Sequence, residues 1–182
     1  MSRIPAVQIL IESDAVQNRV TELARQIQAA YDPTEPPVLL GILKGCLYFL
    51  ADLSRQLDLS IEIDTMCISS YGSGTEHSGT VRIIKDLDGD IAGRHVLIVE
   101  DIVDTGLTLD RLLRVLRARS PKSLRVCALL DKASRRQVDV PVDYVGFSIP
   151  DAFVVGYGLD YDQRFRNLPY IGELDLSQHQ EA

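Results

Sequence analysis

The sequence predicts an α/β fold: a mostly parallel twisted sheet flanked by helices, with a small cap or hood built from the terminal segments. Two observations favour this fold. Apolar segments of strand length alternate along the chain with segments of helical periodicity, and several strand segments are almost continuously apolar. Continuous apolar strands are typical of parallel sheets covered by helices on both faces. The length of 182 residues suits a single domain over 1–182.

The first half of the chain contains four predicted elements. They are a helix over 13–31, a strand over 36–43, a helix over 46–57 and a strand over 60–71. In the first helix, Val16, Val20, Leu23, Ile27 and Ala30 recur at helical spacing, and the cap is expected at Ser13 or Asp14. In the second helix, Cys46, Leu50, Leu53 and Leu57 share one face.

The second half continues the alternation. It contains a strand over 95–101, a helix over 106–120, and strands over 123–133 and 142–149. Two segments do not fit. Residues 71–81 hold three glycines and read as a loop that could close over a site. Residues 151–174 are rich in Tyr, Phe and Gly with weak periodicity, and we expect them to cap one end of the sheet.

Composition excludes several classes of protein. A net charge of -7 argues against a broad nucleic-acid-binding face. No apolar run approaches the roughly 18 residues of a membrane span, and the N-terminus does not read as a signal peptide. The three cysteines lie in apolar stretches without C-x-x-C spacing, which favours a reducing cytosol over a disulfide framework or zinc site.

The segment VLIVEDIVDTGLTL, residues 96–109, lies where a strand ends and a helix begins. A turn there aims backbone N–H groups at one point, and the helix dipole adds partial positive charge. Gly106 would allow close approach, and Thr105 and Thr108 could add hydroxyl donors. The segment predicts a seat for a phosphate monoester, although it lacks the P-loop pattern. A capped helix start without a ligand is the alternative.

Three carboxylates precede that seat. Glu100, Asp101 and Asp104 would repel one another unless a cation or hydroxyl donors satisfied them. The adjacent pair could accept hydrogen bonds from vicinal sugar hydroxyls and attract Mg²⁺, provided that the strand is ending there. Asp104 could serve as a general base. Solvated helix caps are the second interpretation.

Residues 96–108 resemble the phosphoribosyl-diphosphate (PRPP) signature of the type I phosphoribosyltransferases. The resemblance extends over most of the chain, to LKG (43–45), SSYGSGT (69–75), LLDKASRR (129–136) and residues 146–172. With DAFVVGYGLDY (151–161) it points to the 6-oxopurine enzymes of that family, which act on hypoxanthine or on hypoxanthine and guanine.

The resemblance implies a purine-salvage enzyme of the cytoplasm. Purine N9 attacks C1 of PRPP, pyrophosphate leaves, and hypoxanthine or guanine becomes IMP or GMP. It implies Mg²⁺ as the cofactor, no nucleic-acid or membrane partner, and a homodimer or homotetramer. Such chemistry calls for charge neutralisation on the leaving diphosphate, positioning and exclusion of water.

Roles on the PRPP side follow from the resemblance. Glu100 and Asp101 would hold the ribose hydroxyls and, directly or through water, Mg²⁺, and Asp160 would bind a second Mg²⁺. Backbone N–H groups of Lys44 and Gly45 and the side chain of Arg166 would contact pyrophosphate. The peptide bond Leu43–Lys44 tends to be cis in the family. The 5′-phosphate would be wrapped by Asp104, Thr105, Gly106, Leu107 and Thr108. Leu107 stands where a polar residue is common, which weakens any side-chain contact there.

Roles on the purine side also follow from the resemblance. Asp104 would face purine N7 and manage its proton, and Lys132 would reach O6. Phe153 would stack on the base while the backbone of Val154 reads its edge. Residues 150–182 would contribute a purine-binding hood. Ser70 and Tyr71 would begin the loop that closes over the reacting centre.

Two other functions stay open from the sequence. Some relatives of this fold are non-catalytic regulators that sense PRPP or nucleotides, but they would want a basic surface and altered acids. The other possibility is an enzyme for xanthine, uracil or adenine. Lys132 with the adjacent AFVV (152–155) favours a 6-oxopurine.

Overall fold

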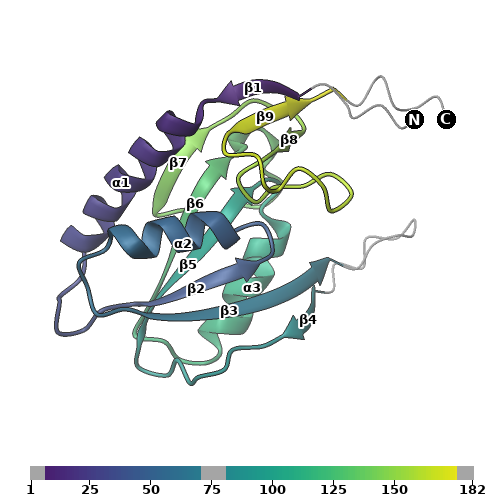
Figure 1. The fold of residues 1–182 in the computed structure, drawn as a ribbon. Coiled ribbons are helices and arrows are strands. Elements are labelled where there is room, and N and C mark those ends of the chain that lie inside the picture. Colours follow the sequence, from purple (N-terminus) through teal and green to yellow (C-terminus); the bar gives the residue numbers. More distant parts are fainter. Residues whose placement is uncertain (1–6, 71–80, 176–182) are drawn as a thin grey trace.

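The computed structural model describes residues 7–70 and 81–175. Its centre is a six-stranded sheet in the order β4-β3-β2-β5-β6-β7, shown in Figure 1. All neighbouring strands are parallel except β3 and β4, which pair antiparallel. The strands are β2 (Val38–Leu43), β3 (Glu62–Ser70), β4 (Val81–Lys85), β5 (His95–Val103), β6 (Ser123–Asp131) and β7 (Tyr144–Ser148).

Helices cover both faces of this sheet. In Figure 1, α1 (Ser13–Ala29) and α2 (Leu47–Gln56) lie on one face, and α3 (Leu107–Arg117) lies on the other. The strands alternate accordingly: Leu97 and Val99 of β5 pack toward α1 and α2, whereas Val96 and Ile98 pack toward α3. The predicted mostly parallel sheet with helices on both sides is confirmed.

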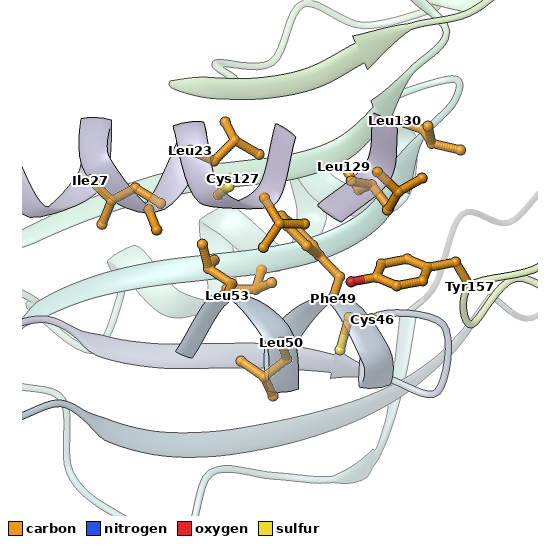
Figure 2. Packing of buried hydrophobic residues seen from close by; sticks show 14 of the residues in the cluster. Leu23, Ile27, Cys46, Phe49, Leu50, Leu53, Cys127, Leu129, Leu130 and Tyr157 are labelled. Atoms are coloured by element: carbon orange, nitrogen blue, oxygen red, sulfur yellow. The ribbon is translucent and has the colours of Figure 1, made fainter. Parts of the chain in front are cut away.

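The larger core cluster joins α1 and α2 to the central strands. Figure 2 shows Leu23 and Ile27 of α1 and Phe49 and Leu53 of α2 gathered around Cys127 of β6. All five side chains are at most 1% exposed. The predicted apolar faces of the helices are therefore the buried faces, although Ala30 is exposed and does not belong to the core.

A second, smaller sheet caps one end of the molecule. It is antiparallel, in the order β1-β9-β8, with β1 (Val7–Ile11), β8 (Val154–Val155) and β9 (Ile171–Leu174). The first and last described strands of the chain therefore build one unit, as Figure 1 shows. This agrees with the predicted cap from the terminal segments.

Tyr157 ties the loop after β8 to the helices. Its hydroxyl donates a 2.6 Å hydrogen bond to Asp52 of α2, which also accepts one from Gln17 of α1. Figure 2 shows the Tyr157 ring pointing toward Phe49, so the tether belongs to the core. Burial alone would raise the pKa of Asp52, but hydrogen bonds from Tyr157, Gln17 and Arg55 outweigh it and lower the pKa below its ordinary value.

Some local predictions are wrong. The N-cap of α1 is Glu12, without a side-chain capping hydrogen bond, rather than Ser13 or Asp14. Strands β1 and β4 have no counterpart among the predicted elements. Strand β5 runs to Val103, two residues beyond the predicted end. Most of the predicted closing loop, with Tyr71, lies outside the described residues. No helix of the described ranges is long and apolar enough to cross a membrane.

Candidate active site

A cavity of about 260 Å³ lies at the carboxyl ends of the parallel strands, where ligands of such sheets bind. Its walls come from the turn after β2, from β3, from the end of β5 and from the start of α3. The lining residues are Ile42, Leu43, Gly45, Ile68, Glu100, Asp101, Ile102, Val103, Asp104, Thr105, Gly106, Thr108 and Leu109. The structure thus brings together most of the acids and the predicted phosphate seat.

Glu100 and Asp101 lie at the point where β5 stops pairing with β2. The pairing of β2 with β5 ends at Gly41 and Val99, one residue before the acids. Both side chains therefore reach one cavity although they are adjacent in a strand. Burial raises the pKa of Glu100 well above its ordinary value, and the neighbouring Asp101 raises it further. Burial also raises the pKa of Asp101 to about 6, against the opposing effect of the Ile102 N–H bond.

Removing the buried charge of Glu100 is expected to stabilise the ligand-free protein. Its pKa is higher in the folded than in the unfolded chain, so its destabilising effect is absent at acid pH and develops as the pH rises above 4.5. Glu100→Gln should therefore raise the unfolding temperature at about pH 8, by about 2–4 °C for each kcal/mol gained, and the gain should shrink toward about pH 4.5. Thermal unfolding at both pH values measures this.

The exposed Glu173→Gln on β9 is the control and should change the unfolding temperature little at either pH. A Glu100→Gln gain that did not depend on pH would show that the buried charge is not its cause.

The backbone of Gly45, in the turn after β2, lies directly against the carboxylate of Asp101. A Cβ built on Gly45 would lie 1.5 Å from Oδ2 of Asp101, so only glycine leaves room for this carboxylate. The peptide bond Leu43–Lys44 is cis, as the resemblance implied. The backbone of this turn therefore faces the acid pair directly.

The predicted phosphate seat lies at the turn that leads into α3. Gly106 precedes α3 with φ of 82°, a left-handed conformation that favours glycine. The carbonyl of Thr105 accepts a 2.9 Å hydrogen bond from Gln137 N, which fixes the loop from behind. Thr105, Gly106 and Thr108 line the cavity, and the first turn of α3 opens into it. Leu107 does not line it, in agreement with the doubt about its side chain.

Asp104 is held from two sides. The guanidinium of Arg136 donates to the Asp104 carbonyl, to the Val103 carbonyl at 2.9 Å and to the Asp131 carboxylate. The side chain of Asp104 forms an ion pair with Arg135, with 2.9 Å between Oδ1 and Nε. Neither arginine was assigned a role from the sequence. The sequence signal that could have indicated them is the pair of adjacent arginines shortly after Lys132 in an otherwise acidic chain.

Of the residues predicted to contact the purine, Asp104 lines this cavity, and Lys132, Phe153 and Val154 do not. Lys132 follows β6 and is 7% exposed, with Nζ 4.0 Å from the Asp151 carboxylate. Phe153 is 40% exposed, so its ring is accessible to a planar ligand. Its edge contact with Tyr161, at 5.7 Å between centroids, fixes the ring. Val154 is buried in β8.

Asp160 and Arg166 form a separate polar group near the turn after β2. Arg166 pairs with Asp160 at 2.8 Å and donates a 2.6 Å hydrogen bond to the carbonyl of Gly158. Lys44 reaches Gln163, which also accepts from Arg166, at 3.4 Å in both cases. Arg166 thus sits between the C-terminal loop and the Lys44 turn. Ser70 ends β3, and Tyr71 lies outside the described residues.

The acid pair offers ligands of the kind that Mg²⁺ prefers. Glu100 and Asp101 supply oxygen ligands, and burial raises the pKa of both carboxyl groups, so a bound cation would favour their charged forms. Within residues 7–70 and 81–175, no group of three or more His, Cys, Asp or Glu side chains is arranged to hold a metal ion. Mg²⁺ commonly uses one or two carboxylates and takes its other ligands from water and substrate phosphates, so two acids suffice.

Comparison with known proteins supports one family. The family model described as a phosphoribosyl transferase domain matches residues 9–162. The chain is 53% identical over 171 residues to the hypoxanthine phosphoribosyltransferase of Escherichia coli (strain K12), covering 93% of this chain and 96% of that protein. It is 51% identical over 166 residues to the hypoxanthine-guanine phosphoribosyltransferase of Bacillus subtilis (strain 168), covering 91% and 92%.

A solved structure agrees with the sequence comparison. The crystal structure of a hypoxanthine phosphoribosyltransferase from Staphylococcus aureus superposes with a TM-score of 0.90 and 46% identity, over 94% of this chain and 93% of that chain. The two proteins thus share their overall fold. The chain belongs to the phosphoribosyltransferase family, among its hypoxanthine and hypoxanthine-guanine enzymes.

Proposed function

We propose that this chain transfers the phosphoribosyl group of PRPP to N9 of hypoxanthine, and also of guanine, in purine salvage. The observation that carries the proposal is the cavity in which two buried acids, a further aspartate and a glycine-led helix start converge. A bond forms between N9 and C1 of the ribose, the bond from C1 to the diphosphate breaks, and pyrophosphate leaves with the electron pair. The products are IMP or GMP and pyrophosphate.

The PRPP side of the proposal uses the cavity itself. Backbone N–H groups from Asp104 to Thr108, including Thr105, Gly106 and Leu107, hold the 5′-phosphate at the start of α3. Glu100 and Asp101 accept hydrogen bonds from the ribose hydroxyls. The backbone of Lys44 and Gly45, with Arg166, binds pyrophosphate. Bound Mg²⁺, held by Glu100 and Asp101 and with a second ion at Asp160, would neutralise the diphosphate charge as it leaves.

The purine side uses residues of β6 and the C-terminal loop. Asp104 accepts or returns the proton at N7 as N9 forms its bond. The ammonium of Lys132 donates to O6, and the exposed Phe153 stacks on the base while the Val154 backbone reads its edge. Residues 150–182 supply the hood, within the single domain 1–182. Ser70 and Tyr71 begin the loop that keeps water from the reacting centre.

The test is a steady-state assay with PRPP and Mg²⁺ against hypoxanthine, guanine, xanthine and adenine. We expect turnover with hypoxanthine and guanine, and much lower turnover with xanthine and adenine. Chelation of Mg²⁺ should abolish the reaction. A protein that bound PRPP but converted none of the four bases would instead be a sensor, a function that the acidic chain and the retained Asp104 do not favour.

Lys132→Ala is expected to weaken hypoxanthine binding while leaving PRPP binding within about twofold. A hydrogen bond from a buried ammonium to O6 contributes about 1.5–3 kcal/mol, so the KM for hypoxanthine should rise about 10- to 100-fold. Discrimination against adenine should fall, because Lys132 no longer selects an oxo group. Initial rates with both bases measure the change.

The matched control is Lys122→Ala, an ion-paired lysine at the other end of the sheet that should leave both KM values unchanged. Unaltered hypoxanthine affinity together with undiminished rejection of adenine would remove the O6 contact.

The same proposal places the enzyme in the cytoplasm as a homodimer or homotetramer. All three cysteines are free thiols and two are buried, which suits a reducing compartment. Family membership supports the assembly. Sedimentation velocity of the purified protein measures it directly.

A further inference from the structure

Four charges of alternating sign connect Asp104 to Lys132. Arg135 Nε lies 2.9 Å from Asp104 Oδ1, and Arg135 also donates to both carboxylate oxygens of Asp151 at 3.0 and 3.1 Å. Asp151 in turn lies 4.0 Å from Lys132 Nζ. This series of charges therefore links Asp104 and Lys132, the side chains assigned to purine N7 and to the neighbouring exocyclic O6.

The two carboxylate oxygens of Asp104 differ in burial and in their contact with Arg135. Oδ1 is buried and faces Arg135 Nε in the ion pair. The Asp104 side chain is nevertheless 41% exposed, and that exposure belongs to its remaining atoms. Oδ2 is the polar atom left to accept a proton from a ligand in the cavity.

Arg135 is itself fixed. It ends a short 3₁₀ helix, Ala133–Arg135, in which its N–H donates to the Lys132 carbonyl at 2.9 Å. Its Nη1 donates to both carboxylate oxygens of Asp151, which restricts the guanidinium further. Arg136 meanwhile holds the backbone of Asp104. Arg136 thus contacts the backbone of Asp104, and Arg135 contacts its side chain.

We infer that Arg135, anchored by Asp151, is a positioning residue that orients the Asp104 carboxylate toward purine N7. The inference rests on the proposed function. It assigns Arg135 no contact with the substrate. An exposed ion pair of this kind adds little to stability, so its effect should appear in turnover rather than in unfolding.

The experiment compares Arg135→Gln with Arg94→Gln. Arg94 is a matched control, because its pair with Glu62 has similar exposure, 41% and 53% against 43% and 57% for Arg135 and Asp151, and lies at the other end of the sheet. Arg135→Gln should lower kcat with hypoxanthine about tenfold, with the KM for PRPP and the unfolding temperature nearly unchanged. Arg135→Lys should recover part of the loss. Arg94→Gln should match the wild type.

A double variant separates positioning from a merely structural role. If Arg135 acts through Asp104, then Arg135→Gln should cost at most about twofold in a chain that already carries Asp104→Asn. An undiminished loss in that background, an unchanged kcat in the single variant, or an equal loss in Arg94→Gln would each overturn the inference. A fall in purine KM with a higher kcat would also overturn it, since Arg135 would then obstruct the site. Wild-type turnover is measured first, so that failure of the proposed function is recognised separately.

Discussion

Asp104→Asn is expected to lower kcat with hypoxanthine by about 10²- to 10⁴-fold, the usual contribution of a positioned acid or base. An amide keeps the size and shape of the side chain but cannot take up the purine proton. PRPP binding should stay within about threefold, because the proposed function has backbone N–H groups, not this side chain, bind the 5′-phosphate. The ion pair with Arg135 would be lost as well, yet it is half exposed and contributes little to stability.

The measurement is single-turnover formation of IMP, with PRPP affinity measured by calorimetry on the same preparation. Asp110→Asn is the control. It lies in the first turn of α3 and pairs with Arg114 on the surface, so it should leave both quantities near wild type. Undiminished turnover in Asp104→Asn would remove the general-base assignment. A parallel collapse of PRPP affinity would show that the side chain binds phosphate instead.

Gly45→Ala is expected to lower activity at least about 100-fold, the usual effect of a displacement of about 1 Å at a reacting centre. The added methyl would lie 1.5 Å from Asp101 Oδ2 and 2.4 Å from its Cγ, so either the carboxylate or the turn must move. Asp101 is held by the N–H of Ile102, which limits where it can go. Both PRPP affinity and kcat should fall, because the proposed function has Asp101 bind the ribose and this turn bind the diphosphate of the same substrate.

Gly89→Ala provides the matched comparison. There the nearest atom, Glu62 Oε1, would lie 3.6 Å away, an ordinary contact, so activity should be retained. Circular dichroism of both variants shows whether the fold persists. A Gly45→Ala enzyme with normal PRPP affinity would mean that the close approach to Asp101 has no part in binding.

Much of the fold could be predicted because its signals are local. The helical periodicity of α1 and α3 and the continuous apolar runs of β2 and β5 each lie within one segment. Strands β1 and β9 depend on each other across almost the whole chain, and neither carries a distinctive pattern alone. The predicted end of β5 is too early, because the two charged residues Glu100 and Asp101 interrupt the apolar run. In the structure β5 continues past them, and their side chains reach the cavity because β2 no longer pairs with β5 there.

The candidate site was predictable where its residues follow one another in sequence. Residues 100–106 and Thr108 line one wall of the cavity. The contacts of Arg135 with Asp104 and Asp151 join three loops, and no spacing in the sequence reveals them. Likewise, only the three-dimensional structure shows that Arg166 and Lys44 meet at Gln163, or that Tyr157 anchors its loop through Asp52.

The pairing of β1 with β9 has a consequence for how the protein is made. Residues leave the ribosome in order, so the central sheet, complete at Ser148, can fold while β1 still waits for a partner. Only when Ile171–Leu174 emerge can the small sheet close. Synthesis thus supplies the central sheet first and the small capping sheet last, and a message cut short after Ser148 would encode the central sheet without β8 and β9.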